Sequence, residues 1–484
     1  MKTLLINPPP YIPGKNCRFL EKLPTQTYTM PLGLGYIASA LESAGHTVSI
    51  VDAYAKKLTF EKLGEIIKET APAVIGITCL SDQRASWFKL IDLIHAVDER
   101  IKVVLGGAHP SLMPEQVLSR CRPDAIVIGE GDETIVELLR TWEKGGDLSS
   151  VKGIAYLANG TAKFTDPRER IQEIDKLRSP AYHLVDISDY KGWDFMSLLS
   201  HLLGREEPPK YASISTSRGC VGDCGYCSAP LIWKRRWTQK GPIPVVDEME
   251  MLQRQYGIEF IIMTDDIFTV NQKRVIAICD EILRRKLNIL WGFETAVNFV
   301  SAELLHRAKM AGCCCILYGV ESGSSSVLSN ISKGINEKEV VNAFRMTREA
   351  GIVSGAFLMV GNPGESERSI NDTINLLRRI DPEIILPQIA MITPGTQIYH
   401  TAQKKGFIDD SYWLTDLQFP YYTCEQNLKT LLRWYRKIFY YKNSDSGILL
   451  RTIRDFIEFH TGIRISKKGL SRAEVPRDQS VRSG

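Results

Sequence analysis

Short apolar segments alternate with amphipathic helical segments twice along this chain of 484 residues. Such alternation predicts parallel sheets with helices on both faces. In residues 1–145 the expected strands are Thr3–Asn7, Thr47–Val51, Ala73–Thr78, Lys102–Leu105 and Ala125–Ile128. The expected helices between them are Leu32–Ala44, Phe60–Glu69, Arg84–Val97, Pro114–Ser119 and Glu133–Lys144. This order favours a doubly wound, flavodoxin-like domain of the α/β class, whose ligands bind beyond the carboxyl ends of the strands.

The second series begins near Tyr211 and predicts a partial (β/α)6 barrel over residues 209–410. Its expected strands are Ala212–Ser215, Phe260–Thr264, Leu290–Phe293, Cys314–Val320, Val353–Val360 and Glu383–Ile389. Its expected helices are Val245–Gln255, Gln272–Lys286, Ala302–Ala311, Asn336–Ala350 and Glu367–Ile380. In complete barrels the chemistry takes place at the carboxyl ends of the strands, and we expect the same here.

Two further regions flank the barrel. Residues 146–208 are interpreted as a connector with a hairpin, because Asn159-Gly160 is a turn signal between the apolar segments Ile154–Leu157 and Ala162–Thr165. Residues 411–484 are predicted to form a small helical region with a polar tail. Its amphipathic helices are expected at Cys424–Lys442 and Gly447–His460.

Three closely spaced cysteines follow the first expected strand of the barrel. Cys220, Cys224 and Cys227 have a Cys-x3-Cys-x2-Cys spacing. Cysteine thiolates at such spacing hold iron–sulfur clusters. A four-iron cluster ordinarily takes four thiolates, and this segment offers three, so one iron would be open to a substrate or cosubstrate. Glycines between the cysteines would let the loop wrap closely around the cluster.

Two other interpretations of these cysteines are weaker. Structural zinc sites usually have four ligands in paired Cys-x2-Cys units, and the chain has no second unit. Disulfide frameworks are typical of small secreted chains. Among the eleven cysteines, Cys313, Cys314 and Cys315 are adjacent and look like small apolar residues of a buried strand. We therefore expect a reducing, cytoplasmic environment.

Composition narrows the choice of partners. The 60 basic and 56 acidic residues leave a net charge of +4, which is too balanced to indicate nucleic acid binding. No apolar run reaches the ~18 residues of a membrane helix, and the first residues lack the apolar core of a signal peptide. We expect a protein without a transmembrane segment, as a monomer or homodimer.

Several motifs beyond the cysteines strengthen one family resemblance. The cysteine segment resembles the signature of the radical S-adenosylmethionine (SAM) superfamily. Segments at the ends of later barrel strands resemble the cobalamin-binding branch of that superfamily: Thr264–Phe268, Tyr318–Ser324, Met359–Glu365 and Thr393–Thr396. N-terminal segments resemble the cobalamin-binding domain of the same branch: Asn7–Pro10, Pro31–Tyr36, Gly106–His109 and Gly129–Asp132. The resemblance implies three cofactors, namely a [4Fe-4S] cluster on the three cysteines, SAM and cobalamin.

The resemblance also implies roles for particular residues. Asp265 or Asp266 would contact the SAM amino group, and Glu321 a ribose hydroxyl, because carboxylates suit both partners. The remaining cofactor-binding residues implied are Tyr226 and Gly361 in the barrel and Gly106, Gly107, His109, Gly129 and Glu130 in the N-terminal domain. Alternatives stay open: the two aspartates could cap a helix, Gly361 could serve a turn, and His109 could be a hydrogen-bonding surface residue.

One departure limits what can be said of the cobalt. The Asp-x-His-x-x-Gly pattern of classical cobalamin methyltransferases is absent, since none of the eight histidines has an aspartate two residues before it. The sequence therefore does not support a histidine ligand to cobalt. Glycine-rich turns after strands also suit dinucleotides, but no Gly-x-Gly-x-x-Gly follows the first strand.

The function implied by the resemblance is methyl transfer to an unactivated carbon, or to phosphorus, of a small molecule. One SAM would methylate cobalt, and cleavage of a second would give a 5′-deoxyadenosyl radical that activates the substrate. An external electron donor of the flavodoxin or ferredoxin class is implied as a partner. The alternatives are an anaerobic ring cyclase, a methylthiotransferase with a second cluster on Cys17, Cys79 and Cys121, and a cobalamin sensor. A sensor would have no use for an open iron.

Overall fold

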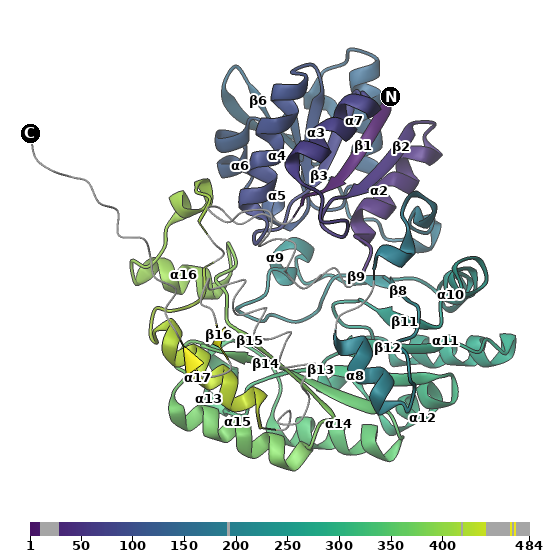
Figure 1. The fold of residues 1–484 in the computed structure, drawn as a ribbon, viewed down its shortest axis with the longest axis vertical. Helices are drawn as coiled ribbons and strands as arrows, with labels where there is room; N and C mark the ends of the chain where they lie inside the picture. Colours follow the sequence, from purple (N-terminus) through teal and green to yellow (C-terminus); the bar gives the residue numbers. More distant parts are fainter. Residues whose placement is uncertain (10–28, 191–193, 418–419, 442–464, 467–468, 471–484) are drawn as a thin grey trace, which may run out of the picture.

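The computed structural model describes residues 1–9, 29–190, 194–417, 420–441, 465–466 and 469–470 (Figure 1). The expected helix Gly447–His460, and Cys17, lie outside these ranges. No helix within them is both long and apolar enough to cross a bilayer.

The N-terminal domain is a doubly wound α/β sheet, as predicted. Its parallel strands lie in the order β2-β1-β3-β4-β5, which is the flavodoxin order. The strands are β1 Lys2–Asn7, β2 Thr47–Asp52, β3 Val74–Thr78, β4 Lys102–Gly106 and β5 Ala125–Val127. Apolar residues of α3 (Phe60–Thr70), α4 (Arg84–Val97) and α6 (Pro114–Cys121) pack on one face of the sheet. Those of α2 (Leu32–Ser43) and α7 (Asp132–Glu143) pack on the other.

A hairpin extends this sheet beyond residue 145. Strands β6 (Ile154–Ala158) and β7 (Thr161–Phe164) pair antiparallel, and β6 pairs with β5. Asn159 and Gly160 both have positive φ, as a two-residue hairpin turn requires. The sequence analysis predicted this hairpin but assigned it to the connector, residues 146–208. Its pairing with β5 makes it part of the N-terminal sheet, so a connector in the structural sense begins only after Phe164.

The second sheet forms the predicted partial barrel. Six parallel strands lie in the order β15-β14-β13-β12-β11-β8, with helices packed outside them (Figure 1). The strands are β8 Tyr211–Ile214, β11 Phe260–Met263, β12 Leu290–Thr295, β13 Cys313–Glu321, β14 Val353–Val360 and β15 Ile384–Ile389. The helices are α10 Pro242–Tyr256, α11 Gln272–Arg285, α12 Ala302–Met310, α14 Glu337–Glu349 and α15 Glu367–Ile380. Cys313, Cys314 and Cys315 are buried in β13, as expected.

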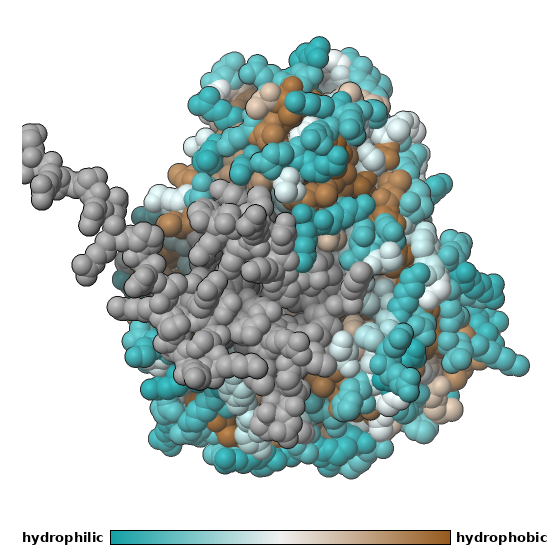
Figure 2. Space-filling model, in the orientation of Figure 1, coloured by the Kyte–Doolittle hydropathy of each residue, from teal (hydrophilic) through white to brown (hydrophobic). Residues whose placement is uncertain are grey.

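The C-terminal part closes the barrel edge. Helix α17 (Leu428–Phe439) packs on β14, β15 and α15. It begins four residues later than predicted, because the Asn427 side chain caps it by accepting a hydrogen bond from the Thr430 N–H. Short helices that the sequence analysis did not predict are α5 Ala108–Leu112, α8 Asp194–Leu202, α9 Ala229–Trp233, α13 Ser325–Asn330 and α16 Gln397–Lys404. The visible surface is mostly hydrophilic, with apolar residues scattered among the polar ones (Figure 2).

A buried polar network joins the two domains. Lys240 donates to Glu248 at 2.7 Å and to the Tyr36 hydroxyl of α2 at 3.0 Å. Tyr182, from the segment between the domains, donates to the other oxygen of Glu248 at 2.9 Å. The side chains of Lys240 and Glu248 are 4% and 1% exposed, so their charges compensate each other away from solvent.

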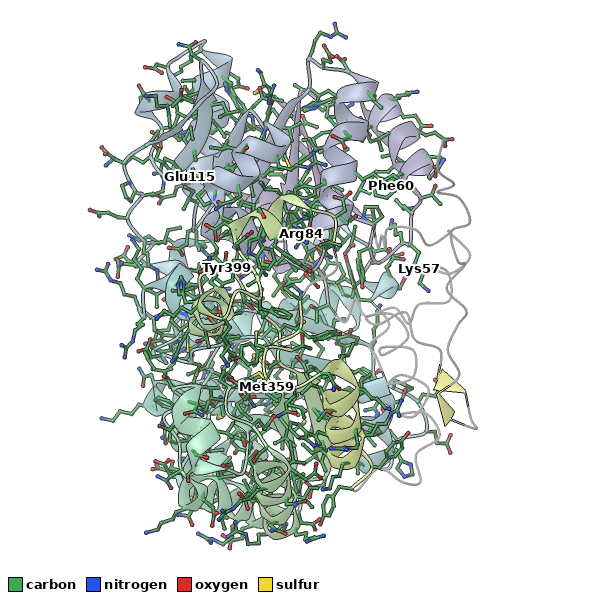
Figure 3. All side chains as sticks on the ribbon, turned by 90° about the vertical axis from the view of Figure 1, so that its left-hand side faces the viewer. Lys57, Phe60, Arg84, Glu115, Met359 and Tyr399 are labelled. Atoms are coloured by element: carbon green, nitrogen blue, oxygen red, sulfur yellow. The ribbon has the colours of Figure 1, made fainter. Side chains whose placement is uncertain are left out.

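The C-terminal segment also contacts the N-terminal domain. Arg84, at the start of α4, donates to the carbonyl oxygens of Thr415 and Leu417 at 2.7 and 2.5 Å. Its guanidinium lies over the Tyr412 and Trp413 rings. Figure 3 shows Arg84 where the two parts meet. Segments more than 300 residues apart in the chain are thus held together at the strand ends of both sheets.

Candidate functional site

The three motif cysteines line one cavity, with about 1150 Å³ of open space, at the carboxyl ends of the barrel strands. All three are free thiols. The Gly222 N–H donates to the Cys220 sulfur at 3.3 Å, and the Ala229 N–H donates to the Cys227 sulfur at 3.4 Å. Burial raises the pKa of Cys227 to about 11, so iron binding must displace the thiol proton.

The donor set fits a cluster better than a single ion. No three histidine, cysteine, aspartate or glutamate side chains of the described residues lie close enough together to hold one metal ion. In a [4Fe-4S] cluster each thiolate binds a different iron, so the thiols stand apart around the cube. N–H groups directed at sulfur are a usual feature of such sites. Three thiols in a cavity with N–H donors therefore fit a cluster with one open iron.

The loop that carries the cysteines is fixed at its start. Asp265 accepts hydrogen bonds from the backbone N–H groups and the hydroxyls of Thr216 and Ser217. Gly219 has φ +98°, and a Cβ there would lie 2.1 Å from the Arg236 carbonyl oxygen. Only glycine fits that position. The Asp265 carboxylate is 2% exposed and fully engaged, so it serves the loop and does not face the cavity.

Four other carboxylates line the cluster cavity: Asp223 of the cysteine loop and three that come from neighbouring strands. Asp266 follows β11, Glu294 lies near the end of β12, and Glu321 ends β13. Burial, together with nearby Asp266 and Asp265, raises the pKa of Glu294 to about 7. Burial also raises the pKa of Asp266. Among the residues that the structure describes, none hydrogen-bonds the Glu294 carboxylate, so it is available to a ligand.

Glu321 belongs to a small polar group inside the same cavity. It accepts hydrogen bonds from the Tyr226 hydroxyl and from the Lys333 ammonium, both at 2.9 Å. Glu321 has φ +64°, a strained conformation for a non-glycine residue that often marks a functional site. Lys333 is 11% exposed and is the cation that directly balances this carboxylate.

Two of these residues were missed by the sequence analysis. Neither Glu294 nor Lys333 belongs to a motif with an evident spacing. The signal for Glu294 was present, because it is an acidic residue at the carboxyl end of a barrel strand. Lys333 lies in a loop twelve residues beyond the end of β13, and only the folded chain brings it to Glu321.

Gly361 is not in the lining of this cavity. Its backbone N–H donates to Glu365, and a Cβ at its position would lie 3.0 Å from the Leu431 side chain of α17. Its φ of +90° serves the turn after β14. The alternative that Gly361 serves a turn is therefore the one that its contacts fit.

A second cavity, with about 1220 Å³ of open space, lies at the carboxyl ends of the N-terminal strands. It reaches down between the sheet, at Leu5 and Val104, and the helices α2 and α7, at Leu34 and Ile135. The wall that faces the N-terminal domain comes from the barrel and contains Ser215, Ser217, Arg218, Gly219, Trp233, Thr264 and Asp266. A broad space with a deep apolar slot fits cobalamin, which has a flat macrocycle and a nucleotide tail.

Four of the five N-terminal residues predicted to bind a cofactor line this second cavity, namely Gly106, Gly107, Gly129 and Glu130. Gly107 has φ +104°, and a Cβ there would lie 3.0 Å from the Cys79 carbonyl oxygen. The Glu130 carboxylate is occupied, since it accepts hydrogen bonds from Arg218 at 2.9 Å and from the Ile171 N–H at 3.0 Å.

The fifth residue, His109, is placed elsewhere. It is fully buried, contacts the Ser81 hydroxyl at 2.8 Å and packs between Trp87 and Trp413. Burial and the nearby Arg84 lower the pKa of His109 to about 3, so it is neutral. The alternative that His109 lies on the surface is wrong, and His109 is not in the lining of the second cavity. The physical reason is the C-terminal segment, which covers this loop.

The cysteines proposed for a second cluster gain no support. Cys79 and Cys121 are buried in the apolar core between the sheet and α4 and α6, at 0% and 8% exposure. Burial raises the pKa of both thiols. They behave as small apolar core residues.

Comparison with known proteins agrees with this arrangement. A sequence model of the B12 binding domain matches residues 24–139, and one of the Radical SAM superfamily matches residues 214–377. The chain is 30% identical over 442 residues to an uncharacterized methyltransferase, PH0819, of Pyrococcus horikoshii, covering 90% of this chain and 92% of that protein. It is 28% identical over 372 residues to the anaerobic magnesium-protoporphyrin IX monomethyl ester cyclase of Rubrivivax gelatinosus, covering 75% of this chain and 64% of that protein.

The same fold occurs in a solved structure. The radical SAM methyltransferase TsrM of Kitasatospora setae, with cobalamin and a [4Fe-4S] cluster bound, superposes with a TM-score of 0.69 at 20% identity, over 84% of this chain and 78% of that chain. The chain belongs to the cobalamin-binding branch of the radical SAM superfamily. It is an enzyme of this class, and its cofactors are a [4Fe-4S] cluster, SAM and cobalamin.

Proposed function

We propose that this enzyme is a methyltransferase that acts on an unactivated carbon, or on phosphorus, of a small molecule. The observation that carries the proposal is the position of Asp266, which lines both the cluster cavity and the second cavity. The two cavities therefore meet at one carboxylate. A substrate held there would face both cofactors at once. The proposed reaction requires this, because hydrogen is removed from the substrate on the cluster side and the methyl group arrives from the cobalamin side.

The cluster cavity has the groups that SAM needs. SAM carries an ammonium, a carboxylate and ribose hydroxyls, and each has a complementary partner here. Glu294 or Asp266 suits the ammonium, Lys333 suits the carboxylate, and Glu321 suits a hydroxyl. Because Lys333 and Glu321 are 2.9 Å apart, the carboxylate and the ribose would lie side by side in this part of the cavity.

The second cavity supplies the other cofactor site. Gly106, Gly107 and Gly129 leave its wall free of side chains where the strands end. When bound, the cluster with SAM supplies a hydrogen-abstracting radical, and cobalamin supplies a methyl group. The protein's own part is to hold these groups in place and to exclude water between them.

An external one-electron donor completes the proposal. Lys234, Arg235 and Arg236 are exposed directly after α9, and Arg235 pairs with Asp223 of the cysteine loop at 3.3 Å. This basic stretch, residues 234–236, suits an acidic donor of the flavodoxin or ferredoxin class, because opposite charges steer such encounters.

The coproducts of SAM test the reaction. Reconstituted enzyme, reductant, cobalamin and candidate small molecules should yield a product that has gained a methyl group. S-adenosylhomocysteine and 5′-deoxyadenosine should form in about equal amounts, after correction for uncoupled cleavage, because each turnover uses one SAM in each way. A product formed with deoxyadenosine but without S-adenosylhomocysteine would reject methyl transfer.

That second outcome would favour a ring cyclase. The 28% identity to the magnesium-protoporphyrin ester cyclase is the observation in its favour. The two reactions need the same cluster and the same cobalamin domain, so only the coproducts separate them.

A further inference from the structure

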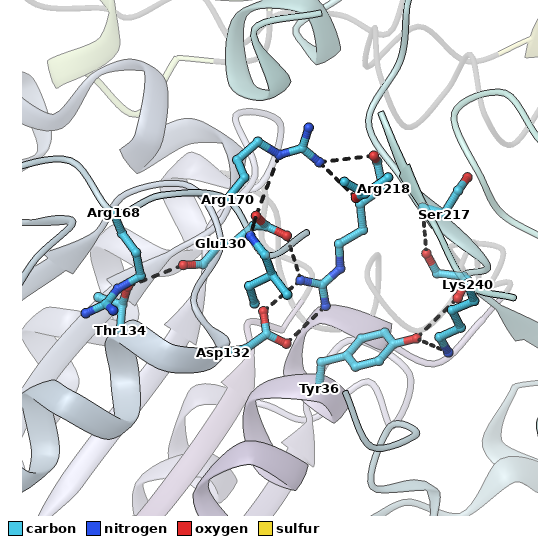
Figure 4. A network of polar contacts seen from close by, with 12 residues as sticks. Tyr36, Glu130, Asp132, Thr134, Arg168, Arg170, Ser217, Arg218 and Lys240 are labelled. Carbon is cyan, nitrogen blue, oxygen red and sulfur yellow. Dashed lines mark hydrogen bonds and ion pairs between the residues drawn. The ribbon is translucent and has the colours of Figure 1, made fainter. Parts of the chain in front are cut away.

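Arg218 ties the cysteine loop to the N-terminal domain (Figure 4). Its guanidinium donates to both carboxylate oxygens of Asp132, at 2.8 and 3.0 Å, and to Glu130 at 2.9 Å. The same group lies over the Tyr36 ring, 5.0 Å from its centroid. The Arg218 side chain is 13% exposed, and those of Glu130 and Asp132 are 6% and 7% exposed. These ion pairs are therefore poorly screened by water.

The backbone around Arg218 is held by other groups, namely Asp265 and Arg170. Its neighbour Ser217 is bonded through both N–H and hydroxyl to Asp265. The Arg218 carbonyl oxygen accepts a hydrogen bond from Arg170 at 3.1 Å. The first cluster ligand, Cys220, follows two residues later. The path of the loop into the cluster site thus depends on contacts from both domains.

The groups that hold Arg218 also form the wall of the cobalamin cavity. Tyr36, Glu130, Asp132 and Arg218 itself all line it. A ligand that fills this cavity packs against the same side chains that fix the guanidinium. Cobalamin in this cavity would exclude the remaining water from the ion pairs and strengthen them, because opposite charges attract more strongly in a surrounding of low dielectric constant.

We propose that Arg218 is a positioning residue that couples cobalamin binding to the seating of the cluster loop. Bound cobalamin strengthens the ion pairs of Arg218 with Glu130 and Asp132, and Arg218 in turn places the backbone that leads to Cys220. By thermodynamic linkage the effect runs both ways, so a bound cluster must raise the affinity for cobalamin by the same factor. Lysine cannot replace arginine here, since it can neither bind Asp132 with two parallel hydrogen bonds nor stack flat on Tyr36.

The test measures this coupling in the full-length protein, prepared anaerobically with and without the cluster. Hydroxocobalamin affinity is determined for both forms by titration. We expect the cluster-loaded form to bind roughly tenfold more tightly, within the usual range of coupling between sites. In Arg218→Lys the two forms should bind within about twofold of each other. Hydrogen exchange of residues 217–227 in the cluster-free protein should slow on addition of hydroxocobalamin, and this slowing should be lost in Arg218→Lys.

The matched control is Arg168→Lys. Arg168 also bonds to α7, through Thr134 at 2.7 Å and Glu137, but has no contact with the cysteine loop among those described. It should keep the full coupling. A purely structural role for Arg218 would weaken both cobalamin affinities equally and leave their ratio unchanged, which would overturn the proposal. Equal affinities in the unsubstituted protein would overturn it too. If Arg218→Lys fails to fold, Asp132→Asn removes the same ion pair from the other side and must lower the ratio.

Discussion

Asp265 and Asp266 are adjacent in the chain, but of the two only Asp266 lines the cluster cavity and the cobalamin cavity. Asp265 accepts hydrogen bonds from Thr216 and Ser217 and is buried beneath the start of the cysteine loop. Asp266 lines both the cluster cavity and the cobalamin cavity. One carboxylate builds the site and the next one is presented to ligands.

We expect substitutions of Asp265 and Asp266 to have different effects on stability and on SAM binding. Asp265→Asn should lower the free energy of unfolding by about 2 kcal/mol, because hydrogen bonds to a buried charge are lost. Asp266→Asn should leave stability nearly unchanged, since Asp266 accepts none of the hydrogen bonds by which Asp265 fixes the cysteine loop. SAM affinity of Asp266→Asn should fall about tenfold. Chemical denaturation and SAM titration of both variants check this, and equal destabilisation by both would contradict it.

Glu294 predicts a pH-dependent stability in cofactor-free protein. Its pKa of about 7 lies above its ordinary value, so the folded state holds the proton more tightly than the unfolded state. This contribution is fully present below about pH 4.5 and is lost as pH rises through about 7. Glu294→Gln should therefore be as stable as the unsubstituted protein at pH 5 and more stable at pH 8, by up to about 3 kcal/mol.

The measurement is the free energy of unfolding of both proteins across this pH range. A constant difference between them would show that Glu294 does not titrate there. In the same variant SAM binding should weaken at pH 8, because a neutral amide replaces a carboxylate opposite the ammonium.

The cluster assignment predicts a sharp contrast between cysteines. Anaerobically reconstituted protein should hold about four irons per chain at this site. Cys224→Ala should lose iron and all SAM cleavage while keeping its fold. Cys424→Ala, which changes a partly exposed cysteine outside the cluster cavity, should behave as the unsubstituted protein. Iron content and 5′-deoxyadenosine formation are the readouts, and SAM cleavage by Cys224→Ala would refute the assignment.

Gly106 offers a way to block the second cavity without straining the chain. A Cβ at this position meets no atom within 4 Å, and its φ is not in the left-handed region. Gly106→Phe should fill the cavity mouth and abolish cobalamin retention on gel filtration, whereas Gly106→Ala should retain it. Iron binding should survive in both. Retention of cobalamin by Gly106→Phe would place the cofactor elsewhere.

The basic stretch predicts a defect that depends on the reductant. Reversing the charges of Lys234 and Arg236 to glutamate, while keeping Arg235, which lines the cluster cavity, should raise the concentration of flavodoxin needed for half-maximal SAM cleavage by about tenfold at low salt. Chemical reduction with dithionite should restore the rate, since the cluster itself is unchanged. Lys338→Glu, on the exposed face of α14, is the control. Slow cleavage with dithionite as well would point to damage to the site.

The local pattern of the sequence was enough for most of the framework. Helix α4 was predicted with the bounds it has, because its apolar residues recur at helical spacing and short polar segments flank it. Strand β14 was predicted in full for a similar reason, since its apolar run is bounded by glycines. Such elements are decided by residues near one another in the chain.

The features that the sequence analysis did not predict depend on contacts between residues far apart in the chain. His109 is buried by Trp413, which lies in the C-terminal segment, and no local signal indicates that contact. The hairpin β6–β7 was recognised from its turn, but its pairing with β5 is set by the sheet edge. Lys333 reaches Glu321 only because α13 returns the chain to the cavity. Asp265 and Asp266 could not be told apart, since strand geometry decides which one faces the ligand.

The buried contact of Lys240 with Glu248 and Tyr36 bears on how the enzyme acquires its largest cofactor. Swinging the two domains apart would pull Tyr36 from Lys240 and let water reach a charged pair that is now almost fully enclosed. Such separation is costly, so it does not suit routine exchange. Cobalamin would then enter during assembly of the chain or through the mouth of the cavity. A cofactor that does not exchange routinely would stay for many turnovers.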